Sequence, residues 1–126
     1  MVLRFQVALL TIALLLATGC EGGKKAKDYS VYTGGNWRRG KQLIESHGCG
    51  TCHVIPGVRN AIGLVGPPLV WWSRRTYIAG ELPNTPDNLV RWIVSPPSVE
   101  PGTAMPSVGL SEQDARDVAA YLYTLR

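Results

Sequence analysis

Charge is scarce in this chain of 126 residues: charged side chains make up 17% of it, and the formal net charge is +4. From Ser30 onward, nine basic and seven acidic residues leave a net charge of +2. So small an excess excludes a nucleic-acid-binding surface, which needs a dense basic patch. Hydrophobic residues reach 45%, which excludes a disordered chain.

Long regular patterns are also absent. The chain is too short for two domains of ordinary size, it contains no internal repeat, and no run alternates long enough to predict a sheet. Glycine (14 residues) and proline (9 residues) are frequent, which favours short helices joined by long loops. We therefore expect one small all-α domain.

An uncharged run of fifteen residues extends from Phe5 to Gly19. As a helix it would span only about 22 Å, less than the ~30 Å hydrocarbon core of a bilayer, so a membrane-spanning helix is disfavoured. Arg4 precedes the run, and small residues end it. This pattern predicts a secretory signal over residues 1–19.

Cys20 follows the run directly. The segment Leu16–Cys20 resembles a bacterial lipobox, although Ala17 stands where leucine is usual. We expect Cys20 to carry a lipid and residues 20–35 to form the anchor and a polar tether to the domain. The alternative is ordinary cleavage near Gly19, which leaves Cys20 as a stray thiol.

The other two cysteines lie in Cys49-Gly50-Thr51-Cys52-His53, and C-x-x-C-H is the attachment motif of c-type haem. Two thiols on one helical turn can bond the two vinyl groups of one porphyrin, and the adjacent histidine can then ligate the iron. A thiol-redox motif would be expected beside a βαβ pattern, which is absent. A structural zinc site would need four ligands. Only His47 lies close enough in sequence to join Cys49, Cys52 and His53.

A haem iron bound by His53 needs a second axial ligand, and methionine is scarce. Met105 is the only methionine after Met1, and it lies in Pro101–Pro106 (PGTAMP), where prolines stiffen the loop. We expect Met105 to be this ligand; the alternative is a core side chain. His47 is too close to His53 in sequence to reach the opposite haem face.

Three segments have helical patterns. The first begins at Asn36 and ends near His47, the second begins at Thr85-Pro86 and ends at Pro96-Pro97, and the third begins at Ser111. A short helix over Leu69–Tyr77 is a further expectation. Of the adjacent Trp71 and Trp72, one is expected to pack and the other to be exposed.

Taken in order, these segments resemble class I cytochrome c over about residues 36–126. The matching features are Gly40 and Ile44 in the first helix, the C-x-x-C-H motif, Gly66-Pro67-Pro68-Leu69, the PGTAMP loop and Ala120-Tyr121-Leu122. The resemblance implies an all-α cytochrome c fold with three main helices and long loops around one covalent haem c. It also implies that the first and last helices cross through Gly40 and Tyr121.

The resemblance assigns roles to four further residues. Pro67 matches a proline whose carbonyl binds the axial histidine, and Trp92 matches an aromatic residue near the methionine. Arg75 and Thr103 match residues beside the haem propionates. Arg75 as a plain surface charge and Trp92 as ordinary core remain alternatives.

A closer likeness lies in Ala79–Thr85 (AGELPNT) and Asn88–Ile93 (NLVRWI). These segments look like the haem domain fused to subunit II of some bacterial cytochrome c oxidases. No copper-binding domain precedes them here, so the resemblance implies a free-standing relative of that haem module.

The function expected from these features is that of an electron carrier, not an enzyme. It would be tethered on the periplasmic side of a bacterial membrane and would exchange electrons with a terminal oxidase or a quinol-oxidising complex. The alternative is a haem enzyme or gas sensor in which Met105 leaves the iron and peroxide or nitric oxide binds. An enzyme would need a distal acid, base or arginine, and Arg75 is the only weak candidate.

Overall fold

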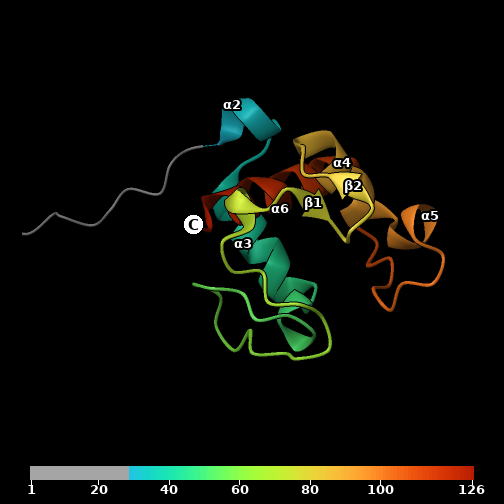
Figure 1. The fold of residues 1–126 in the computed structure, drawn as a ribbon. Coiled ribbons are helices and arrows are strands. Elements are labelled where there is room, and N and C mark those ends of the chain that lie inside the picture. Colours follow the sequence, from blue (N-terminus) through green and yellow to red (C-terminus); the bar gives the residue numbers. More distant parts are fainter. Residues whose placement is uncertain (1–28) are drawn as a thin grey trace, which may run out of the picture.

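The computed structural model describes residues 29–126 (Figure 1). The predicted signal, Cys20 and most of the predicted tether lie outside the described residues. Three longer helices form the frame of the domain, and α6 packs against both of the others. They are α3 (Trp37–Ser46), α4 (Pro86–Val94) and α6 (Glu112–Thr124). The predicted all-α fold with three main helices is confirmed, and the described residues add only one small two-stranded sheet.

Each of the three helices begins at a side-chain cap that the sequence predicts. The Asn36 side chain accepts hydrogen bonds from the amides of Arg38 and Arg39, at 3.0 and 3.2 Å. Thr85 accepts from the Asn88 amide, and Pro86 occupies the first helical position. At α6, Ser111 accepts from the Asp114 amide at 3.1 Å. These local contacts satisfy amides that would otherwise lack partners, which explains where the helices start.

Helices α3 and α6 cross in close contact at Gly40. A Cβ atom added to Gly40 would lie only 1.9 Å from the carbonyl oxygen of Asp117, so no larger residue fits there. Ile44, one turn later in α3, is 1% exposed. Tyr121 lies one turn beyond the crossing and donates its hydroxyl hydrogen to the Pro56 carbonyl at 2.7 Å. The aromatic residue therefore ties the loop after the C-x-x-C-H motif to α6.

The folded unit begins before residue 36. Helix α2 (Ser30–Thr33) contacts α6, and Thr33 is buried with 1% of its surface exposed. The Asn36 amide also donates to the buried carboxylate of Asp117 at 2.7 Å. Residues 29–35 therefore belong to the domain, although the predicted tether extended to residue 35. The reason is long-range packing against α6, which no local pattern reveals.

The segment before α4 differs from its predicted helix over Leu69–Tyr77. Only a single 3₁₀ turn forms there, at Trp72–Arg74, because Trp71 adopts a left-handed conformation with φ 51°. A two-stranded antiparallel hairpin follows, with β1 (Tyr77–Ile78) and β2 (Leu82–Pro83). Its turn contains left-handed Ala79 and Gly80, and its strands are too short to produce an alternating pattern.

Two smaller expectations have clear outcomes. Helix α4 ends at Val94, just before Pro96, and the prolines then begin a separate short helix, α5 (Pro96–Val99). Trp72 packs into the core with 4% of its surface exposed, while Trp71 is 60% exposed. In residues 29–126, no helix has the length and apolar character that crossing a bilayer requires.

Candidate functional site

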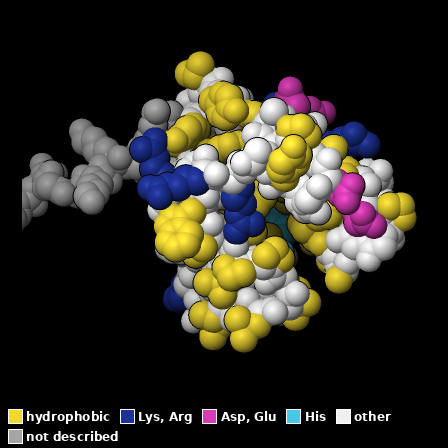
Figure 2. Space-filling view, in the orientation of Figure 1, with side chains coloured by type: hydrophobic (Ala, Val, Ile, Leu, Met, Phe, Trp, Pro, Cys, Tyr) yellow, Lys and Arg dark blue, Asp and Glu magenta, His cyan; other side chains and the backbone are white. Residues whose placement is uncertain are grey.

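A cavity of about 690 Å³ opens between the helices and the long loops. Its walls come from the C-x-x-C-H segment, the turn and hairpin before α4, the Met105 loop and the inner faces of α4 and α6. Figure 2 shows it as a hollow with a histidine inside and a basic side chain at its edge. Most of the lining is apolar, which suits a large flat hydrophobic group.

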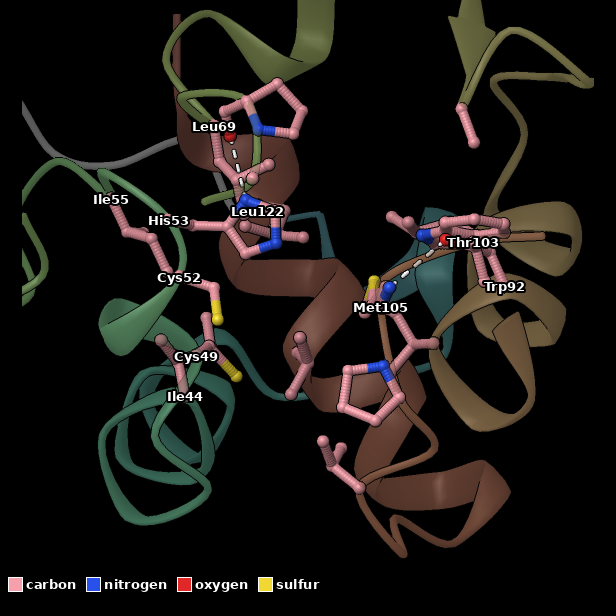
Figure 3. Close-up of a pocket in the computed structure, with 18 of the residues that line it drawn as sticks. Ile44, Cys49, Cys52, His53, Ile55, Leu69, Trp92, Thr103, Met105 and Leu122 are labelled. Atoms are coloured by element: carbon pink, nitrogen blue, oxygen red, sulfur yellow. Dashed lines mark hydrogen bonds between the residues drawn. The ribbon is translucent and has the colours of Figure 1, made fainter. Parts of the chain in front are cut away.

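The two cysteines reach this cavity from one short segment: Cys49 begins the 3₁₀ turn Cys49–Thr51, and Cys52 directly follows it. Their thiols are free and partly buried, and Figure 3 shows both sulfur atoms on the same side of the cavity. Burial raises the pKa of the Cys49 thiol, so this group stays protonated at neutral pH. Two unpaired thiols at the wall of an apolar cavity are suited to covalent attachment of a ligand inside it.

His53 is fixed by the backbone on two sides. Its Nδ1 lies 2.8 Å from the carbonyl oxygen of Pro67, which can only accept, so Nδ1 carries the hydrogen. A Cβ atom on Gly66 would come within 2.2 Å of the imidazole ring, so glycine is required at this position. The lone pair is thereby left on Nε2, which is the state that a metal ligand needs.

Met105 comes from the opposite wall of the cavity (Figure 3). Its amide donates to the Thr103 hydroxyl oxygen at 3.2 Å, which holds the loop in a tight local turn. Trp92, on α4, is 9% exposed and lines the same cavity as Thr103. Met105, Thr103 and Trp92 therefore line the cavity that His53 also lines, with Met105 on the wall opposite the imidazole (Figure 3).

Arg75 lines the cavity directly after the 3₁₀ turn Trp72–Arg74. Its guanidinium donates to the carbonyls of Pro68 and Val70 and lies over the Trp72 ring, 5.1 Å from the ring centroid. Partial burial lowers the pKa of Arg75, as expected for a cation partly removed from water. All ion pairs within residues 29–126 involve Arg39 or Arg116 instead. Arg75 thus bears a positive charge that no described carboxylate balances.

Sequence reasoning missed Asn84, which precedes the cap of α4. Its side-chain amide makes three hydrogen bonds, to the backbone carbonyls of Trp72 and Arg75 and to the Tyr123 hydroxyl. An asparagine before a Thr-Pro cap has no sequence signal that distinguishes it from a turn residue.

The Trp72 ring nitrogen is the one buried side-chain nitrogen or oxygen in the described part of the chain that lacks a hydrogen-bond partner.

The donor set fits a haem better than a bare metal ion. Across residues 29–126, no three His, Cys, Asp or Glu side chains gather as a metal site would require. The Nδ1 atom of His47, the residue that ends α3, lies 3.0 Å from the carbonyl oxygen of Leu43 in the same helix. This ring nitrogen is therefore already engaged in a local hydrogen bond. Two thiols, an oriented imidazole, a thioether and an apolar cavity are together what a covalently attached haem requires.

Comparison with known proteins gives the same assignment. The family model for cytochrome c matches residues 37–126. The chain belongs to the cytochrome c family. Its cytochrome c domain is 36% identical over 89 residues to cytochrome c oxidase subunit 2 of Alkalihalophilus pseudofirmus. It is 27% identical over 88 residues to the subunit of the same name in Bacillus subtilis (strain 168).

These alignments cover 70% and 68% of this chain but only 25% of each relative. The cytochrome c domain thus spans about a quarter of the length of the curated relatives that it matches. The expected resemblance to class I cytochromes, and to the haem domain of oxidase subunit II, is confirmed. The protein is a haem-binding electron-transfer cytochrome.

Proposed function

We propose that this protein carries single electrons between respiratory redox partners through one haem c, with His53 and Met105 as axial ligands. The observation that carries this proposal is that an oriented imidazole and a thioether face the same apolar cavity from opposite walls. The haem would supply an iron that alternates between the ferrous and ferric states. Histidine–methionine ligation raises the reduction potential relative to harder ligand pairs.

The residues of the chain would hold this group in a defined environment. Cys49 and Cys52 would bind the porphyrin covalently, and the Pro67 carbonyl would keep the imidazole in one tautomer and raise its basicity. Arg75 would neutralise a propionate, and the Thr103 hydroxyl hydrogen remains available to a second acceptor. Trp92 would pack beside the Met105 thioether and exclude water from it.

Substitution of Met105 by alanine tests the axial ligand. The oxidised wild type should show the weak methionine-to-iron absorption at the red end of the visible spectrum, and Met105→Ala should abolish it and lower the potential. Val108→Ala is the control, because Val108 lines the cavity from the same loop without a sulfur atom. An unchanged spectrum and potential in Met105→Ala would eliminate this ligand.

Electron exchange and enzymatic turnover predict different reactions for the reduced protein. Stopped-flow reoxidation should be fast with membranes that contain a terminal oxidase and slow with hydrogen peroxide alone. Fast reoxidation by peroxide, with none by the membranes, would support a haem enzyme instead.

We infer further that the protein works at the periplasmic face of a bacterial membrane, attached through a lipid on Cys20. The relatives named as oxidase subunit 2 support a membrane-associated respiratory role and a terminal oxidase as partner. A Cys20→Ser variant should move from the membrane fraction to the soluble periplasmic fraction. A wild type that is already soluble in the periplasm would contradict the lipid anchor.

A further inference from the structure

We propose that Asn84 and Tyr123 are positioning residues that hold Arg75 at the haem cavity and thereby set the reduction potential. Neither side chain lines the cavity, so both would act through the 3₁₀ turn that ends at Arg75. The inference rests on the proposed function, because it takes a haem propionate as the partner of Arg75.

Asn84 connects the two ends of this turn. Its side-chain Nδ2 donates to the Trp72 carbonyl at 3.1 Å and to the Arg75 carbonyl at 3.0 Å, which uses both hydrogens of the amide. Its backbone amide donates to the Thr76 carbonyl at 2.9 Å. One residue thus fixes three carbonyl groups on the segment that carries Arg75.

Tyr123 fixes the orientation of the Asn84 amide. Its hydroxyl donates to Oδ1 of Asn84 at 2.9 Å, so the amide oxygen must face α6 and the amide nitrogen must face the turn. Tyr123 is 4% exposed, and burial raises its pKa, so the hydroxyl keeps its hydrogen at physiological pH. A carboxylate at position 84 could accept from Tyr123 but could donate to neither carbonyl of the turn.

The position of the Arg75 charge depends on this scaffold. Among the described residues, the Arg75 guanidinium bonds only to neutral carbonyl oxygens, and it lies over the Trp72 ring. Asn84 holds the backbone carbonyl of Arg75. A cation near the haem favours the reduced state, which has one positive charge fewer, and the effect is strong where water is excluded. Loosening the turn should therefore lower the potential, as should removal of the arginine.

The test compares reduction potentials of the haem-loaded protein at one pH. Arg75→Gln should lower the potential, Asn84→Ala should lower it by a smaller amount, and Tyr123→Phe should lower it by less than Asn84→Ala. In the Arg75→Gln background, Asn84→Ala should cause no further change. Asn88→Ala is the matched control, because Asn88 also donates from its side chain to a backbone carbonyl, that of Pro83, and should leave the potential unchanged.

The possible failures are distinguishable. An unchanged potential in Arg75→Gln would remove the proposed role of Arg75 and this inference with it, while the axial-ligand test stands separately. A lowered potential in Arg75→Gln with no change in Asn84→Ala or Tyr123→Phe would overturn the positioning role alone. An equal drop on Asn84→Ala with and without Arg75 would also overturn it. If Asn84→Ala fails to load haem, the nearly isosteric Tyr123→Phe decides the question.

Discussion

At the scale of single residues, the close approach of Gly66 to His53 helps to fix the orientation of the imidazole in the cavity. The imidazole has the Pro67 carbonyl at one nitrogen and the Gly66 backbone beside its ring. Any side chain at position 66 would displace the ring from the direction that the hydrogen bond fixes. The orientation of His53 therefore depends on glycine at position 66.

We expect Gly66→Ala to impair histidine ligation. The added methyl group would lie 2.2 Å from the ring, so the imidazole or the loop must move, at a cost of about 1–3 kcal/mol in the free energy of unfolding. Visible spectroscopy and the yield of haem-loaded protein measure the effect. Gly102→Ala is the control, because the nearest atom there is a flexible carboxylate oxygen at 3.3 Å. Equal spectra and yields for both variants would contradict this account.

At the scale of helices and strands, α6 anchors the other parts of the domain. Its first turn carries Asp114, which accepts from the Ser111 hydroxyl at 2.7 Å and pairs with Arg39 of α3. These bonds, the Ser111 bond first, lower the pKa of Asp114. The carboxylate is thereby coupled both to the start of α6 and to the crossing of α3 and α6.

The pH dependence of stability follows from this shift. A carboxyl group whose pKa is lowered on folding stabilises the native state fully above its unfolded pKa of about 4, and this contribution disappears as the pH falls through the folded pKa. Asp114→Asn should therefore be less stable than wild type at pH 7 and equally stable at the lowest pH. Urea unfolding across this range measures the difference. Asp87→Asn, at an 85% exposed side chain, should show little change at any pH, and a constant difference for Asp114→Asn would refute the coupling.

What could be predicted at this scale depended on the range of the contacts. The caps at Asn36, Thr85 and Ser111 involve residues two or three positions away, so the helix starts were visible in the sequence. The C-x-x-C-H motif and the Met105 loop are local in the same sense. Burial of Thr33 against α6 and the bond between Asn84 and Tyr123, 39 residues apart, depend on tertiary packing and left no local pattern.

At the scale of the whole molecule, exposed apolar side chains lie on the loop that borders the cavity. Ile62, Leu64 and Val65 are 77%, 87% and 75% exposed, and Val65 also lines the cavity. The net charge of +2 from Ser30 onward would be nearly cancelled by two haem propionates. An encounter with a redox partner at this surface should depend more on apolar contact than on long-range attraction.

We therefore expect the rate of electron exchange to depend weakly on salt. Between low and physiological ionic strength it should change by no more than about threefold, against the tenfold or larger changes of strongly steered pairs. Stopped-flow mixing of the reduced protein with oxidase membranes over a salt series measures this. Leu64→Ser should slow the exchange at every ionic strength, whereas a steep decline with salt in the wild type would indicate charge-steered docking.

The two ends of the described domain meet. The guanidinium of Arg126 donates to the Tyr29 hydroxyl at 2.7 Å and lies over its ring, and neither residue lines the cavity. A domain whose first and last residues lie side by side can be fused, inserted or circularly permuted. The connecting chain then does not need to cross the mouth of the cavity. Ends that lie together give a physical reason why a domain of this kind can be joined to a longer chain, and the alignments cover a quarter of each relative named cytochrome c oxidase subunit 2.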